Sequence, residues 1–215
     1  MPSPPSAPSA GTELTAGPWG HGGICASRRD DGLMVLVSGA IPGERVRVEV
    51  TEQRRTYARG SVIEVLEAAP SRVRPPWPEG AALGVTDLGH VAPISARQAK
   101  GEVVTGLLAQ IGGIAWPVEV EPVGTGAALG WRTKIELTVA ADGRAGMYSR
   151  RSETLVPLAA MPLAVPELAA LGLFERRWPV GSRLTAVAPS AGTPFCLVDG
   201  SPADRVRREA VCVRG

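Results

Sequence analysis

Short apolar runs separated by glycine-rich turns dominate the first third of the chain. In residues 45–50 valine alternates with charge at a period of two, which is typical of a strand with one face in water. Residues 33–37 are almost wholly apolar, which indicates a buried strand. Asp31-Gly32 is a hairpin signal, and residues 39–44 form a second turn. The pattern predicts strands at residues 13–16, 24–27, 33–37, 45–50 and 57–66.

Closure into a small barrel is the way in which five such short strands can bury their apolar faces. We therefore expect residues 12–69 to form a five-stranded β-barrel. Residues 1–11 have no basic or long apolar stretch, which is typical of a disordered arm rather than a signal peptide. Residues 70–94 are a proline-rich connector, of which residues 72–78 are expected to be stiff and extended rather than folded.

One helical segment and several short strands follow the connector. Residues 95–111 place apolar side chains on one helical face, with Ser95 as the expected N-cap and Gly112-Gly113 as the stop signal. This pattern predicts an α+β domain over residues 95–215. Its expected strands lie at residues 118–122, 135–139, 147–150, 184–188 and 195–198, with a short helix at 166–171.

The last residues predict an interrupted element. Residues 205–214 alternate as the start of another strand, and a terminal strand without a partner exposes its backbone hydrogen-bonding groups. We therefore expect the domain to be truncated at its C-terminus.

Composition changes this picture only slightly. A 44% apolar content can supply a core, and a net charge of +2 neither requires nor excludes a nucleic-acid partner. Among the basic residues only Lys100 and Lys134 are lysines; this bias fits phosphate contact, although a GC-rich genome explains it more simply. No apolar run is long enough to span a bilayer. Cys25, Cys196 and Cys212 stand far apart, which predicts a reduced, cytoplasmic protein without a zinc site.

Residues 20–76, from GHGGICASRR to APSRVRPP, resemble a TRAM domain, an RNA-binding barrel of the oligonucleotide-binding (OB) type. The residues that follow resemble the central domain that RNA (uracil-5-)methyltransferases carry between their TRAM and catalytic domains. That likeness depends on His90 in LGHVAP, LGWRTKIELTV at residues 129–139 and LVPLAAMPLAVPEL at residues 155–168. The resemblance implies a mainly β fold, with an N-terminal five-stranded OB-like TRAM β-barrel followed by a small α+β domain. It also implies 23S rRNA or tRNA as the partner.

Two departures from that family concern its cofactors. Many relatives bind a [4Fe–4S] cluster through four cysteines, but residues 75–90 contain none and Met161 occupies the last ligand position. Methionine and tryptophan cannot replace the thiolates, so we expect no cluster. The family's S-adenosylmethionine-binding and catalytic domain would follow Gly215, so the chain alone is predicted to be inactive. Cys212 has no activating neighbour, and residues 123–130 open no helix and predict no phosphate loop.

Basic side chains with a neighbouring aromatic ring are the candidate RNA contacts, and they fall into two groups. Glutamates at positions 44, 49 and 52 could instead neutralise the first group, and the second could be ordinary surface charge. Trp19 and His21 could stack a base, although Trp19 could equally cap the barrel core. The first group is Arg45, Arg47, Arg54, Arg55, Tyr57 and Arg59, and the second is Arg132 and Lys134 together with Arg150 and Arg151.

The predicted function is the RNA-binding portion of an RNA (uracil-5-)methyltransferase-like protein, without a catalytic, cofactor or metal site of its own. A separately encoded catalytic domain is a candidate second partner. One alternative is a stand-alone TRAM RNA-binding or regulatory module, and another is a barrel that binds a protein. The residues do not distinguish rRNA from tRNA.

Overall fold

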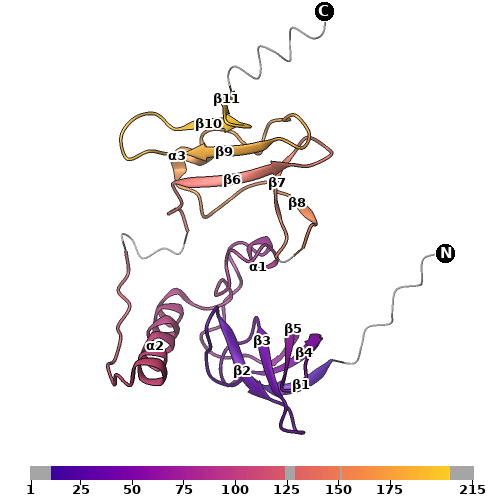
Figure 1. Ribbon diagram of the computed structural model, residues 1–215, viewed down its shortest axis with the longest axis vertical. Helices are drawn as coiled ribbons and strands as arrows, with labels where there is room; N and C mark the ends of the chain where they lie inside the picture. The colour runs from indigo at the N-terminus through magenta and orange to yellow at the C-terminus, as the bar shows by residue number, and fades with distance from the viewer. Residues whose placement is uncertain (1–10, 124–128, 151, 204–215) are drawn as a thin grey trace, which may run out of the picture. The chain divides into compact units, whose positions relative to one another are not determined.

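The computed structural model describes residues 11–123, 129–150 and 152–203 (Figure 1). By their contacts these residues divide into two compact units, one within 1–81 and 85–123 and the other within 82–84 and 124–215. The first unit contains a five-stranded sheet and the second a six-stranded sheet, with few helices, which confirms the predicted mainly β fold class. Contacts group the long helix with the barrel, whereas the sequence places it in the domain after the connector.

The first sheet has the strand order β1-β4-β5-β3-β2, in which β3 and β5 are parallel and the other pairs antiparallel. Each strand lies within a few residues of its expected position, because alternation and glycine turns fix short strands well. The strands are β1 Thr12–Thr15, β2 Ile24–Arg28, β3 Met34–Ser38, β4 Arg45–Gln53 and β5 Tyr57–Glu67.

Hydrogen bonds between the chain after β1 and strand β2 close this sheet into a barrel. The Ala26 N–H donates to the Pro18 carbonyl at 2.9 Å, and the Gly17 N–H donates to Ser27 Oγ at 3.0 Å. A Cβ atom at Gly17 would lie 1.9 Å from the Ala26 carbonyl oxygen, so this approach requires glycine. Trp19 packs, partly buried, against the barrel core. That core is small and aliphatic: Leu14, Ala16, Cys25, Val35, Val37, Ala40, Val46, Val48 and Ala58.

The segment after the barrel is folded rather than extended. It contains the short helix α1 (Glu79–Ala82), and Arg72 forms an isolated β-bridge with Val91. Trp77 is buried, with 5% of its surface exposed. Proline restricts the backbone but does not prevent it from packing, so residues 72–78 contain no helix and yet carry the buried Trp77.

Helix α2 (Pro93–Gly112) begins earlier than its predicted cap. Ala92 is the N-cap and Pro93 occupies the first turn, where its missing N–H costs no hydrogen bond. The predicted stop is confirmed, because Gly113 adopts a φ of 64° and donates to the Ala109 carbonyl. The apolar face predicted from the sequence is largely exposed, with Ile111 81% exposed.

The strand predicted at residues 118–122 does not form. The Val118 N–H donates to Thr105 Oγ1 at 2.9 Å, so this segment lies along α2. A Cβ atom at Gly101 would lie 2.5 Å from the Val118 carbonyl oxygen, and glycine therefore permits the approach. A contact with the helix replaces the expected pairing in a sheet.

The second sheet is antiparallel, with the order β11-β10-β9-β6-β7-β8. The predicted Asp142-Gly143 turn is confirmed, since Gly143 has a φ of 77° and the Arg144 N–H donates to Asp142 Oδ1 at 3.0 Å. Residues 205–214, predicted to start a strand, lie outside the described residues. The elements are β6 Lys134–Val139, β7 Ala145–Tyr148, β8 Leu155–Pro157, α3 Pro166–Ala169, β9 Arg183–Val187, β10 Phe195–Val198 and β11 Ser201–Pro202.

One face of the second sheet supplies the core of its unit. Ile135, Leu137 and Val139 alternate on β6 and are nearly fully buried, as are Leu184 and Ala186 on β9. The side chains between them are exposed or half-buried, so the opposite face meets solvent. None of the helices in the described ranges combines the length and the apolarity needed to cross a membrane.

Candidate nucleic-acid interface

The hairpin between β4 and β5 carries three arginines, two of them exposed and one half-buried. The Arg54 N–H donates to the Tyr57 carbonyl at 2.8 Å, which closes a loop of residues 54–56. Arg54 and Arg55 are exposed on this loop, and the Arg59 guanidinium lies 5.6 Å from the centre of the Tyr57 ring. We call Arg54, Arg55, Tyr57 and Arg59 the β4–β5 tip.

The β4–β5 tip keeps a positive charge after its ion pairs are counted. Glu52 pairs with Arg54 at 2.6 Å and with Arg59 at 3.5 Å. Arg55 has no ion-pair partner within the part of the chain that the structure describes. Three arginines against one glutamate leave a local charge of +2 (3 − 1).

Arg45 and Arg47, the other predicted barrel contacts, lie among carboxylates. Arg45 Nε donates to Glu67 at 2.9 Å and Arg47 Nη2 donates to Glu13 at 2.7 Å, while Glu64 also pairs with Arg47. Two arginines against three glutamates give a local charge of −1 (2 − 3). A hydrogen bond from Arg47 lowers the pKa of Glu13, so this acid is ionised at neutral pH.

Sequence reasoning assigned the neutralising role to Glu44, Glu49 and Glu52, and the structure assigns it largely to other acids. Cross-strand register brings Glu13, Glu64 and Glu67 beside Arg45 and Arg47. Of the three expected acids, Glu52 pairs with Arg54 and Arg59 of the β4–β5 tip, and Glu44 pairs with Arg72.

Glu44 is a buried structural residue. Its side chain is fully buried and accepts hydrogen bonds from the backbone N–H groups of Ile41 at 2.9 Å and Ala69 at 3.0 Å. Arg72 donates to both carboxylate oxygens, each at 2.6 Å, and also to the Gly39 carbonyl at 2.7 Å. Burial raises the pKa of Glu44, but the hydrogen bonds from Arg72, Ala69 and Ile41 outweigh it and hold the pKa below its ordinary value. This carboxylate fixes the segment after the barrel to the turn before β4.

His90, one of the residues that carry the family resemblance, also has a structural role. Its Nε2 lies 3.2 Å from the Ala40 carbonyl oxygen, which can only accept, so Nε2 carries the hydrogen. The Val73 N–H donates to the His90 carbonyl at 2.9 Å. Burial lowers the pKa of His90, and the charge of Arg72 lowers it further. The hydrogen bond to Ala40 and the charge of Glu44 act in the opposite direction, but the net effect in the folded barrel favours the neutral imidazole.

Acidification below pH 6.5 is expected to destabilise the barrel unit through His90. The unfolded chain binds a proton near the ordinary pKa of 6.5, whereas the folded chain resists it, so stability falls as the pH drops below that value. The slope for one proton is at most about 1.4 kcal/mol per pH unit. Urea unfolding at several pH values should show this slope in the parent and in His21→Gln, which changes an exposed histidine. His90→Gln should flatten it, and an unchanged slope in that variant would contradict the assignment.

The second predicted basic group is only partly brought together. Lys134 begins β6 and pairs with Glu136 at 3.0 Å, whereas Arg132 precedes the strand and lies 5.2 Å from the Trp131 ring centre. The Arg150 N–H donates to the Ala82 carbonyl, and Arg151 lies outside the described residues. RNA contact by Arg132 and Lys134 stays a prediction.

Comparisons with known proteins extend this description. The TRAM domain family matches residues 16–63, which cover most of the five-stranded barrel. Residues 16–63 are a TRAM domain. An uncharacterized RNA methyltransferase of Streptomyces avermitilis is 34% identical over 190 residues, covering 82% of this chain and 44% of that protein. One from Corynebacterium glutamicum is 35% identical over 191 residues, covering 87% of this chain and 46% of that protein.

One further relative and one solved structure with a similar fold are named as uracil methyltransferases. The 23S rRNA (uracil(1939)-C(5))-methyltransferase RlmD of Halomonas elongata is 35% identical over 160 residues, covering 70% of this chain and 32% of that enzyme. The crystal structure of Pyrococcus abyssi tRNA (uracil-54, C5)-methyltransferase shares the fold, with a TM-score of 0.51, 21% identity, and coverage of 86% of this chain and 48% of that chain. The TRAM-containing chain is thus homologous to RNA uracil-5-methyltransferases, and it spans a third to a half of the length of these relatives.

Proposed function

We propose that this chain is the RNA-binding portion of an RNA (uracil-5-)methyltransferase-like protein. We also propose that the β4–β5 tip is its main phosphate contact. The supporting observation is the +2 charge that remains at the tip of a TRAM barrel after ion pairing. Arg45 and Arg47 contribute less to phosphate binding, because glutamates already neutralise their charge. The target class is 23S rRNA or tRNA, the two substrates named for its relatives.

The chemistry of the β4–β5 tip suits single-stranded RNA. Arg55 has no ion-pair partner among the described residues and can donate to a phosphate, and Arg54 can exchange its exposed bond with Glu52 for a phosphate oxygen. Arg59 lies over Tyr57, and a base can stack on that ring or on the guanidinium plane. The tip therefore combines anion binding with stacking in four residues.

The cysteines of the described residues support a role in binding rather than in methyl transfer. Addition to carbon 6 of uracil requires a thiolate. Burial raises the pKa of the Cys25 thiol to about 12, and burial also raises the pKa of Cys196. Neither side chain is activated as a nucleophile, and Cys212 lies outside the described residues. We propose that S-adenosylmethionine and the catalytic residues belong to another domain, adjoining or separately encoded.

We also propose that the protein carries no iron–sulfur cluster, because the residues present do not fit one. The segment of residues 75–90 has no cysteine, and its Trp77 and Leu83 are buried apolar side chains. Met161, at the position of the last family ligand, is 5% exposed and uncharged. A cluster of this kind needs thiolate ligands.

The chain alone is expected to transfer no methyl group to RNA. The assay mixes the purified chain with rRNA and tRNA transcripts and isotopically labelled S-adenosylmethionine, and repeats the mixture with any protein encoded directly downstream. A complete relative serves as the positive control. Label incorporated by the chain alone would contradict the proposal, and label that needs the second protein would identify a split enzyme. A stand-alone binding or regulatory module, the alternative, predicts RNA binding without label in every mixture.

A further inference from the structure

The solvent face of the second sheet gathers aromatic, cationic and hydroxyl side chains. Direct cross-strand partners share a face, and the register joins Thr138 to Arg183 and to Gly146, and Val187 to both Lys134 and Phe195. The buried residues of β6 and β9 alternate with these positions, so this face is the one in water. We call Lys134, Glu136, Thr138, Tyr148, Arg183 and Phe195 the outer sheet face.

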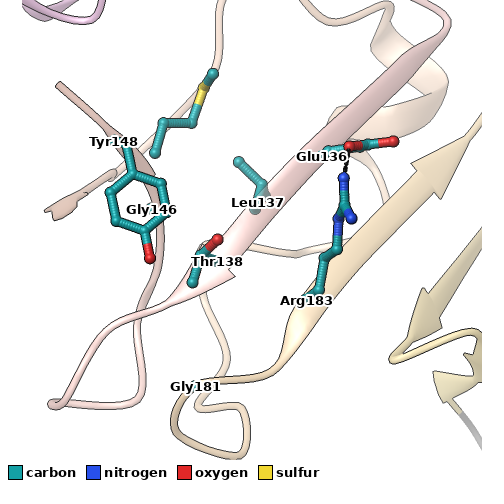
Figure 2. Close-up of a pocket in the computed structure, with 8 residues that line it drawn as sticks. Glu136, Leu137, Thr138, Gly146, Tyr148, Gly181 and Arg183 are labelled. Atoms are coloured by element: carbon teal, nitrogen blue, oxygen red, sulfur yellow. Dashed lines mark hydrogen bonds and ion pairs between the residues drawn. The ribbon is translucent and has the colours of Figure 1, made fainter. Parts of the chain in front are cut away.

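A hollow of about 460 Å³ lies at one end of the outer sheet face. Figure 2 shows the Tyr148 ring on one side of it and the Glu136–Arg183 pair on the other, with Thr138 between them. Gly146 also lines the hollow, and a Cβ atom there would lie 2.4 Å from the Val156 carbonyl oxygen. Close pairing with β8 therefore requires glycine at this position.

Two cations on the outer sheet face already hold an anion. Lys134 pairs with Glu136 at 3.0 Å, and Arg183 pairs with the other carboxylate oxygen. All three side chains are at least 41% exposed, so the ion pairs can rearrange around a second anion. Two cations against one carboxylate leave a charge of +1 (2 − 1).

Two large aromatic side chains on this face are exposed to solvent. Tyr148 is 52% exposed and Phe195 is 43% exposed. Phe195 pairs with Val187 of β9, which pairs with Lys134 of β6, and continuation of the β6–β7 register sets Tyr148 opposite Glu136. The two rings therefore lie on either side of the β9–β6 pair. A protein-binding face is expected to be depleted of charge at its centre, whereas charged residues lie between these rings. Rings on a sheet with interspersed cations match the way proteins bind unpaired bases.

We propose that the outer sheet face binds single-stranded RNA, with one base stacked on Tyr148 in the hollow and a neighbouring phosphate held by Arg183 and Lys134. Thr138 supplies a hydroxyl within the hollow for a base or ribose edge. Phe195 offers a second stacking surface at the other end. This site rests on the proposed RNA-binding function and adds to it a contact surface in the second unit.

The test measures binding of the full chain to a fluorescein-labelled single-stranded RNA 12-mer by anisotropy. Tyr148→Ala is expected to weaken binding about 5- to 150-fold, the effect of losing one stacked base, and Arg183→Ala should lower the salt dependence. Tyr148→Phe keeps the ring and should bind as the parent does. Val180→Ala, which changes an exposed apolar residue outside the proposed contact set, is the matched control. An RNA containing 5-iodouridine should photo-crosslink to the peptide that carries Tyr148.

The outcomes separate this site from the general function. Unchanged affinity in Tyr148→Ala, with weaker binding in the Arg54→Ala/Arg55→Ala double variant, would overturn the proposed site and leave the RNA-binding function standing. Absence of RNA binding by the parent chain would overturn both. If Tyr148→Ala abolishes self-association in sedimentation while RNA affinity stays the same, the face is a protein contact and the proposal is wrong.

Discussion

Replacing Glu44 with alanine is expected to lower the free energy of unfolding of the barrel unit by about 3 kcal/mol or more. The substitution leaves Arg72, whose side chain is 21% exposed, without its carboxylate partner. It also leaves the buried N–H of Ile41 and the partly buried N–H of Ala69 without an acceptor, which adds to the cost. Urea unfolding followed by circular dichroism measures the change.

Glu67→Ala is the matched control for this experiment. Glu67 also pairs with an arginine, Arg45, but its side chain is 70% exposed, so its removal should change stability by less than about 1 kcal/mol. Glu44→Gln keeps the shape but loses the charge, and should fall between the two. Equal effects of Glu44→Ala and Glu67→Ala would show that the buried ion pair has no special role.

Acid should reproduce part of the Glu44 effect. The folded pKa of Glu44 lies below the ordinary value of 4.5, so its stabilisation is present above that pH and is lost as the pH falls through the folded value. This window lies below the one assigned to His90, and the two groups can be separated in a pH series.

The barrel could be predicted from the sequence because its strands are short and local. The Arg-Val alternation of β4 and the glycine turns carry their own signal. The role of Glu44 carries no such signal, because its partner Arg72 lies 28 residues away and joins it only after the chain has passed through β4 and β5. Long-range partners of this kind depend on register, which composition and spacing do not reveal.

Register also explains why some of the candidate arginines have carboxylate partners and others do not. From the sequence, Arg45 and Arg54 are equivalent basic residues on neighbouring parts of one hairpin. The sheet places Glu13 of β1 opposite Arg47 and Glu67 of β5 opposite Arg45, whereas no strand of the described ranges pairs with the loop that contains Arg55. Similarly, the sequence predicted a strand at residues 118–122, but in the structure this segment contacts Thr105 and Gly101 of α2 instead.

Changing Arg54 and Arg55 together to alanine is expected to weaken RNA binding by about tenfold at about 0.1 M salt, as for the loss of two phosphate contacts. Both side chains are exposed, so the variant should fold as the parent does. Arg45→Ala/Arg47→Ala is the matched control, because it removes the same formal charge from the same barrel. Its two arginines are already held by glutamates, and its effect on RNA affinity should be smaller.

The salt dependence of RNA affinity tests the proposed RNA contact at the β4–β5 tip most directly. The dissociation constant for a single-stranded RNA is measured between about 50 and 300 mM salt for the parent and both double variants. Each phosphate contact contributes roughly −0.7 to the slope of log affinity against log salt concentration. We expect Arg54→Ala/Arg55→Ala to reduce the magnitude of that slope by about 1.4, and Arg45→Ala/Arg47→Ala to leave it nearly unchanged. Equal slopes in the parent and Arg54→Ala/Arg55→Ala would contradict the proposal that the β4–β5 tip is the main phosphate contact.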